Sequence, residues 1–116
     1  MDDNFRTRLA KDFAKKAEER LPDILEDVIL YGSVARGEDG NDSDIDLLAI
    51  LKNDDDQNGR IQRGLSEIAY VIGLESGQNI SIQSYPRDHI ERFRSYSFFK
   101  NVFRDGIQIG RDPGDS

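Results

Sequence analysis

Two apolar runs joined by a turn-rich loop decide the fold of this chain: Val28-Ile29-Leu30-Tyr31-Gly32-Ser33 and, after ten further residues, Asp44-Ile45-Asp46-Leu47-Leu48-Ala49-Ile50-Leu51. Short apolar runs bounded by turn signals predict buried β-strands, here at 28–31 and 44–51. The second strand opens with carboxylates at alternate positions, Asp44 and Asp46, which share one face about 6.5–7 Å apart. Packing cannot explain this pair, because desolvation and like charge both make ionised carboxylates costly near a core.

The pair of acids predicts a divalent metal site beside a phosphate-binding turn. Two Mg²⁺ ions about 3.5–4 Å apart, or Mn²⁺ in their place, would fit between the carboxylates. Magnesium prefers oxygen ligands and keeps room for water and substrate phosphates. Gly32 allows a tight turn that a ligand can approach, and we expect Ser33 to cap a short helix whose N–H groups and hydroxyl face an anion. Arg36, one turn further on, would reach a phosphate oxygen or one of the acids.

Gly32-Ser33, followed after ten residues by Asp44-Ile45-Asp46, resembles the signature of the DNA polymerase β-type nucleotidyltransferase superfamily. The small size is similar to that of its minimal nucleotidyltransferases, and the close match covers residues 28–51. The resemblance implies that Gly32 and Ser33 bind a triphosphate and that Asp44 and Asp46 hold the metal ions. It implies in-line attack of an acceptor oxygen on the α-phosphorus of a nucleoside triphosphate, with ATP expected, and release of pyrophosphate. Positioning and electrostatic stabilisation supply most of the catalysis in such reactions.

The sequence departs from the superfamily at one place. A third carboxylate on a neighbouring strand usually completes the site, but the expected strand at 79–84 contains no acid. Its alternation places Asn79, Ser81 and Gln83 on one face, where they offer only neutral oxygens. Glu75, just upstream, is a further candidate for the third position. A non-catalytic module that binds nucleotide or a partner therefore stands as the alternative to an active enzyme.

Several of these residues also have a simple structural interpretation. Asp44 could be a turn residue at the start of its strand, Ser33 only a helix cap, and Arg36 a partner in a surface salt bridge. The single histidine, His89, is expected at an exposed position in the first turn of a helix rather than as a general base. The acids at 54–56 are expected in a solvated loop.

Composition limits the class of protein. A chain of 116 residues is expected to form one domain over 1–110, followed by a disordered tail at 111–116. A net charge of −7 and a pI near 4.6 argue against a nonspecific nucleic-acid binder, so nucleic acid is a disfavoured acceptor. The chain has no cysteine and no apolar segment of membrane-spanning length. The acidic N-terminus lacks an apolar signal region, so a cytoplasmic location is expected.

The remaining pattern predicts an α/β (α+β) fold. A mixed β-sheet with helices packed mainly on one face is expected, with the site at its exposed edge. Apolar spacing and Gly or Pro boundaries predict helices at 5–21, 33–37, 61 to Gly73 or Gly77, and 86–106, together with strands at 28–31, 44–51, 79–84 and 107–109.

Size and aromatic content bear on partners. A domain this small has little surface for gripping an acceptor, so the acceptor is expected to be a separate protein. An aromatic run exceeds what one helix face needs for the core and could form a partner or homodimer surface: Tyr96, Phe98, Phe99 and Phe103. The resemblance implies pairing with a small helical HEPN-type toxin, which the transferase as antitoxin would modify by attaching AMP to a tyrosine. Nucleotidylation of an antibiotic is a third hypothesis, disfavoured because no acceptor-binding domain is present.

Overall fold

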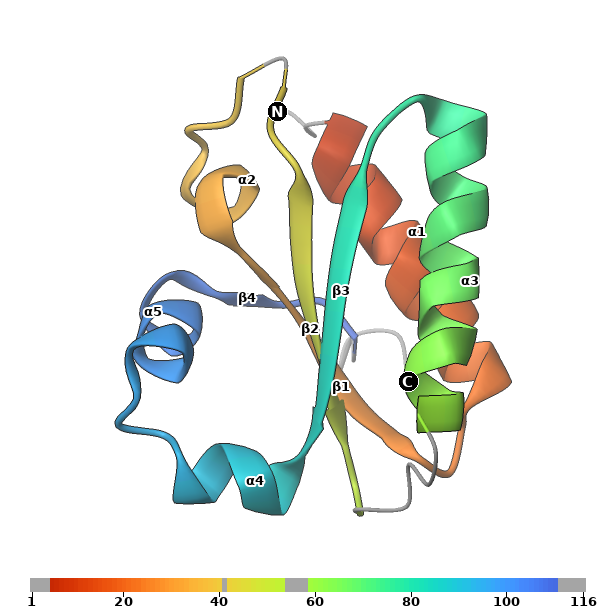
Figure 1. The fold of residues 1–116 in the computed structure, drawn as a ribbon. Coiled ribbons are helices and arrows are strands. Elements are labelled where there is room, and N and C mark those ends of the chain that lie inside the picture. The colour runs from red at the N-terminus through yellow and green to blue at the C-terminus, as the bar shows by residue number, and fades with distance from the viewer. Residues whose placement is uncertain (1–4, 41, 54–58, 111–116) are drawn as a thin grey trace.

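The computed structural model describes residues 5–40, 42–53 and 59–110, which form four strands and five helices in alternation (Figure 1). The expected acidic loop at 54–56 and the tail at 111–116 lie outside the described residues. In chain order the elements are α1 (Phe5–Arg20), β1 (Leu25–Tyr31), α2 (Gly32–Arg36), β2 (Ile45–Leu51), α3 (Arg60–Ser76), β3 (Ile80–Pro86), α4 (Arg87–Arg92), α5 (Ser97–Asp105) and β4 (Ile107–Gln108).

The sheet is mixed, with strand order β3-β2-β1-β4. β1 runs antiparallel to both β2 and β4, whereas β2 and β3 are parallel. The register sets Asp46 of β2 between Tyr31 of β1 and Ser81 of β3. The predicted mixed α/β sheet is confirmed, and the strand expected at 107–109 is present as β4 (Ile107–Gln108). The register of the strands determines which residues flank Asp46.

Two apolar cores lie on opposite faces of this sheet. The longest helices, α1 and α3, pack on one face around Phe13, Leu47 and Leu65, as expected. The short helices α4 and α5 cover part of the other face, where Leu48 and Ile50 contact residues such as Ile90. No helix in the described ranges is long and apolar enough to cross a membrane.

The last helix was predicted as one element, and this prediction is wrong. α4 ends at Arg92, Phe93 leaves the helical region with φ −109° and ψ 22°, and α5 begins at Ser97. A turn closed by the Tyr96 N–H and the Phe93 carbonyl joins the two helices. The break lets Ile90 of α4 and Phe99 of α5 reach the same core, which one straight helix crossing the sheet would not do.

β4 is held to the sheet by a buried carboxylate. Asp27 is 4% exposed, accepts a hydrogen bond from its neighbour Val28 N–H at 2.8 Å, and accepts another from the Gln108 side-chain amide. A side chain at Gly110 would lie 2.3 Å from the Val28 nitrogen, so the chain after β4 passes directly against β1. The contact ties the last strand to the strand that leads into the Gly32 turn.

We expect Asp27→Ala to lower the free energy of unfolding by about 1–3 kcal/mol, because it leaves a buried N–H and the Gln108 amide without an acceptor. Asp27→Asn should cost less, since its carbonyl can still accept from Val28. Urea denaturation of both variants measures the difference. Equal losses in the two variants would contradict this role for Asp27.

Candidate active site

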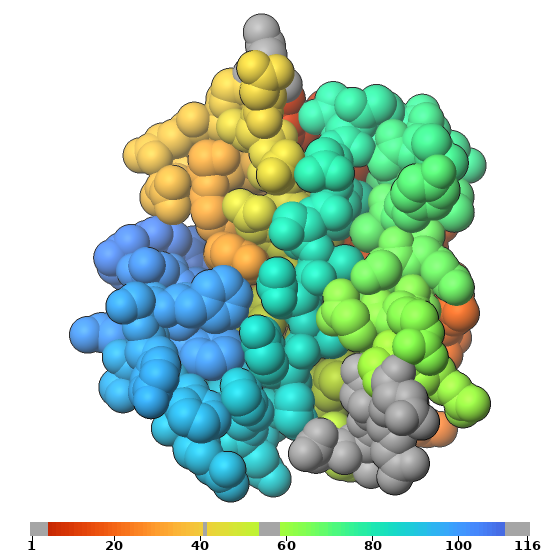
Figure 2. Space-filling model, viewed as in Figure 1, coloured from red at the N-terminus to blue at the C-terminus, as the bar shows by residue number. Residues whose placement is uncertain are grey.

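The two carboxylates lie at the open end of the sheet face that α4 and α5 partly cover. Asp46, Leu48 and Ile50 alternate along β2 on this face, and the helices cover only the two apolar side chains. Asp46 is half-buried and Asp44 is exposed. In Figure 2 β3 runs down the middle of the view, with α2 and the blue α4–α5 segment on its left and α3 on its right. The candidate site therefore lies at the uncovered end of this sheet face.

Gly32, in the turn that ends β1, lies against the Asp46 carboxylate. Its φ of +77° favours glycine, and a Cβ built there would lie 2.3 Å from Asp46 Oδ2. Only a residue without a side chain allows the carboxylate to lie against the backbone of this turn. The structure thus joins the two halves of the sequence motif by direct contact.

Ser33 follows in α2, but its expected role as N-cap is wrong. The helix begins at Gly32, the cap position is Tyr31, and no side chain caps it. The positive φ of Gly32 makes the turn by itself, so the hydroxyl of Ser33 is not needed for capping. Ser33 remains next to the Gly32–Asp46 contact.

Asn79, which immediately precedes β3, orients Asp44, and Arg6 of α1 holds the loop that leads to Asp44. Asn79 Nδ2 donates to Asp44 Oδ1 at 3.1 Å. Arg6 of α1 donates to Asp39 in the loop before Asp44 and to Gln78 beside Asn79, each at 2.8 Å. The Arg6–Asp39 ion pair is largely buried, with side chains 15% and 7% exposed. Sequence reasoning missed Arg6, because its partners lie 33 and 72 positions away and no local pattern connects them.

The electrostatics of the site favour a bound cation. Burial raises the pKa of Asp46, the negative charge of Asp44 raises it further, and Arg36 acts in the opposite direction. Burial, followed by the charge of Asp46 and the neighbouring Tyr85, raises the pKa of Tyr31 to about 12. Tyr31 therefore stays protonated at neutral pH, and the two hard carboxylate oxygens suit Mg²⁺ or Mn²⁺.

Arg36 lies in two salt bridges at the edge of the site. Its Nε is 2.9 Å from Glu38 Oε1 and its Nη1 is 3.6 Å from Asp105 Oδ2 of α5, with 40% of the side chain exposed. The surface salt-bridge interpretation fits this arrangement. Its charge nevertheless acts on Asp46, so one residue links the site to α5.

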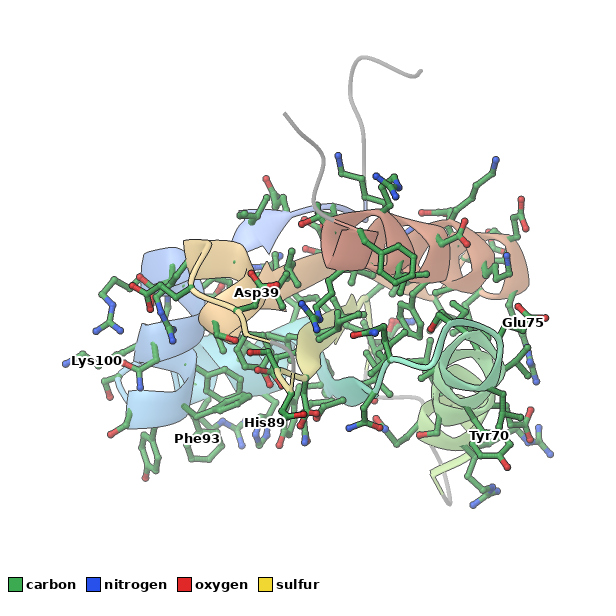
Figure 3. All side chains as sticks on the ribbon, turned by 90° about the horizontal axis from the view of Figure 1, so that it is seen from above. Asp39, Tyr70, Glu75, His89, Phe93 and Lys100 are labelled. Atoms are coloured by element: carbon green, nitrogen blue, oxygen red, sulfur yellow. The ribbon has the colours of Figure 1, made fainter. Side chains whose placement is uncertain are left out.

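The four candidates for the third position are placed differently. Ser81 lies directly opposite Asp46, Gln83 lies opposite Leu48, and Asn79 contacts Asp44. Glu75 is exposed on α3, the helix on the other side of the sheet, and lies far from Asp39 in Figure 3. The structure therefore brings together the three neutral side chains and excludes Glu75. Among the described residues, no group of three or more His, Cys, Asp or Glu side chains could hold a metal.

His89 is not exposed as expected. It is half-buried and stacks on Tyr85 of β3, with ring centroids 4.9 Å apart and planes within 7°. Phe93 and Phe99 also contact the ring. The imidazole belongs to the aromatic packing of α4 and α5, and this packing explains why a histidine stands there.

A groove of about 520 Å³ lies between α3 and β3 and extends to Asn79, the residue that donates a hydrogen bond to Asp44. Tyr70, Leu74 and Ile82 are among its lining residues, whereas Asp44 and Asp46 are not. We place the site at the carboxylates, because a phosphate-handling site needs metal-binding oxygens and a close backbone approach, which the apolar groove does not supply.

A mixed sheet with the Asp46 carboxylate against the Gly32 turn and Asp44 nearby is the arrangement expected of a nucleotidyltransferase domain. The family model of the nucleotidyltransferase domain matches residues 10–106, and the chain belongs to this family.

Known relatives agree with this assignment. The protein named "Putative protein adenylyltransferase MJ1305" of Methanocaldococcus jannaschii is 35% identical over 89 residues, which are 76% of this chain and 60% of the relative. The chain thus spans less than two thirds of that curated relative. A structure described as "Structure of putative minimal nucleotidyltransferase" is 26% identical, with a TM-score of 0.56 over 87% of this chain and 90% of that one. A toxin–antitoxin structure with AMP-PNP shares the fold at 20% identity and a TM-score of 0.58, over 90% and 76% of the two chains.

We expect Asp46→Asn to stabilise the protein at neutral pH. Because folding raises the pKa of Asp46, its ionised form is less favourable in the folded state than in the unfolded chain. The gain should be full above the folded-state pKa and vanish as the pH falls below the ordinary value of about 3.9. Urea denaturation across this pH range measures it, with the exposed Asp42→Asn as control. A gain that persists at low pH, or a loss at neutral pH, would contradict the assignment.

Proposed function

We propose that this chain is a metal-dependent nucleotidyltransferase that transfers AMP from ATP to a partner protein. The contact between the Gly32 turn and the Asp46 carboxylate carries the proposal, because it sets a close backbone approach beside a pair of metal-binding acids. Family membership and the name of the archaeal relative support nucleotidyl transfer as the reaction and a protein as the acceptor.

Each residue of the site has a defined task in this proposal. Asp44 and Asp46 hold Mg²⁺ or Mn²⁺, which when bound would neutralise the charge of the triphosphate. Gly32 and Ser33 position the phosphates by close approach and a hydroxyl donor, and Arg36 adds positive charge at the α5 side. Asn79 and Arg6 hold Asp44 and its loop in place.

In the proposed reaction AMP passes directly from ATP to the acceptor, and no covalent intermediate forms on the enzyme. An acceptor hydroxyl oxygen attacks the α-phosphorus, a new P–O ester bond forms, and the bond between the α-phosphorus and the bridging oxygen breaks. Pyrophosphate leaves, and the hydroxyl proton passes to solvent. The neutral residues opposite Asp46 supply no carboxylate to take this proton, so we expect slow turnover unless the acceptor complex provides a base.

A small helical protein of the HEPN type is the partner we propose, with this chain as its antitoxin in the cytoplasm. The fold shared with the toxin–antitoxin structure that contains AMP-PNP supports this choice. An alternative follows from Ser81, since a site without a third carboxylate suits a module that binds nucleotide and does not turn it over.

Transfer of label from α-labelled ATP to a co-expressed HEPN-type partner, in the presence of Mg²⁺ or Mn²⁺, tests the proposal. We expect Asp44→Asn and Asp46→Asn each to reduce transfer by at least about a hundredfold, because each removes a metal-binding charge. Ser81→Asp should increase the rate if a carboxylate opposite Asp46 is what limits turnover. Calorimetry with Mg²⁺-ATP completes the test. Binding without transfer in the parent and in Ser81→Asp would support the binding module, and no binding at all would refute both functions.

A pair of glycine variants isolates the contact between the turn and Asp46. Gly32→Ala and Gly37→Ala both place a side chain at positive φ, +77° and +72°, and both should lose about 1–2 kcal/mol of stability. Only the alanine at 32 meets Asp46, because nothing lies within 4 Å of a Cβ at 37. We therefore expect Mg²⁺-ATP affinity to fall at least about tenfold in Gly32→Ala and to stay near the parent value in Gly37→Ala. Equal affinities in the two variants would show that the contact does not matter.

A further inference from the structure

Residues 87–104 form a basic segment in an acidic chain. They carry five basic residues, Arg87, Arg92, Arg94, Lys100 and Arg104, and two acidic ones, Asp88 and Glu91, for a net charge of +3. The rest of the chain therefore has a net charge of −10. The segment comprises α4, most of α5 and the turn between them. α1 also has a net charge of +3, but it packs on the other face of the sheet, away from α4 and α5.

The same segment exposes aromatic rings. Tyr96 is 62% exposed and Phe98 is 38% exposed, although both contact other rings. Tyr96, at the cap position of α5, and Lys100 and Arg104 within the helix follow one another at intervals of four, so their side chains lie toward one face. Arg94 stacks over the ring of Phe103 at 4.6 Å. Aromatic residues and arginine are the residue types enriched at protein interfaces.

This surface borders the candidate active site. The ring of Phe98 is 5.7 Å from the ring of Tyr31, and Tyr31 lies directly opposite Asp46 in the sheet. Arg36 joins α2 to Asp105 at the end of α5. Figure 3 shows Lys100 and Phe93 on one side of the molecule and Tyr70 and Glu75 on the opposite side. A partner seated on α5 would therefore reach the carboxylates.

We propose that this surface, defined by Arg94, Tyr96, Phe98, Lys100 and Arg104, binds an acidic, aromatic-containing segment of the acceptor protein and delivers its hydroxyl to the site. Complementary charge would attract such a segment, while Tyr96 and Phe98 would bury apolar area against it. The inference rests on the proposed transfer reaction and adds the chemical class of its acceptor.

The charge distribution favours an acidic protein segment over nucleic acid. Glu91 and Asp105 lie beside Arg94 and Arg104, and these carboxylates would repel a continuous phosphate backbone. The Arg94 and Arg104 side chains stay 50% and 67% exposed, so a short acidic segment can still reach them together with Lys100. Lys100 has no charged partner among the described residues. A net charge of −10 elsewhere would also repel a long polyanion, whereas a short acidic segment can stay on the basic surface.

Binding of fluorescent copolymers tests the surface directly. A short glutamate–tyrosine copolymer supplies the proposed acid and aromatic groups, a lysine–tyrosine copolymer reverses the charge, and a uridine oligonucleotide represents nucleic acid. We expect the full chain to bind the glutamate–tyrosine copolymer best, by fluorescence anisotropy at low salt, and to lose affinity as ionic strength rises. Tighter binding of either other probe would overturn the proposal.

Matched variants locate the binding surface. Lys100→Glu/Arg104→Glu should weaken copolymer binding at least about fivefold, whereas Lys15→Glu/Lys16→Glu makes the same charge change on exposed residues of α1 and should have little effect. Tyr96→Ala should weaken binding more than Tyr70→Ala, although the two rings are similarly exposed at 62% and 67%. Equal effects within either pair would refute the surface.

Nucleotide binding separates this inference from the proposed function. Mg²⁺-ATP affinity should be unchanged in Lys100→Glu/Arg104→Glu, because neither residue belongs to the carboxylate site. Suppose that the parent binds Mg²⁺-ATP, but that Lys100→Glu/Arg104→Glu binds the copolymer as well as Lys15→Glu/Lys16→Glu does. The proposed acceptor surface is then wrong, and the nucleotide site stands. If the parent fails to bind Mg²⁺-ATP, the proposed function fails, whatever the copolymer does.

Discussion

The approach of the Asp46 carboxylate to the Gly32 backbone is the constraint around which the site is built. It requires a residue without a side chain at the end of β1 and a β1–β2 register that sets Tyr31 opposite Asp46. It also requires the loop between these strands to return Asp44 to the same end of the sheet. The buried Arg6–Asp39 ion pair and the Asn79–Asp44 hydrogen bond serve that purpose from two other parts of the chain.

Ionised Asp46 is energetically unfavourable in the site, and a bound cation would reduce this cost. Asp46 is half-buried beside a second carboxylate, and its pKa is raised as a result. Active sites commonly reduce stability in this way, because the groups that bind a charged ligand are poorly solvated before it arrives. The neutral face of β3 is the unusual part of the site. Ser81 lies opposite Asp46 in the register, so β3 supplies no carboxylate at this position of the site.

The break between α4 and α5 has consequences for both packing and recognition. It brings Ile90 and Phe99 into one core, and it leaves Tyr96 and Phe98 at the surface. The resulting face combines aromatic rings with a basic segment of an acidic chain. Phe98 of this face contacts Tyr31, so a protein bound there would lie close to the carboxylates.

Local pattern in the sequence determined the family, the absence of an acid on β3, and two neighbouring strands predicted at 28–31 and 44–51, which the structure places at Leu25–Tyr31 and Ile45–Leu51. These features depend on side-chain alternation and turn chemistry within about twenty residues, so they can be read from neighbouring positions. Tertiary structure alone decided that Ser81 lies opposite Asp46, that Glu75 lies on the far face, that Arg6 braces the Asp44 loop, and that the last helix divides in two. Each of these depends on strand register or on contacts between distant parts of the chain, and no local propensity specifies such contacts.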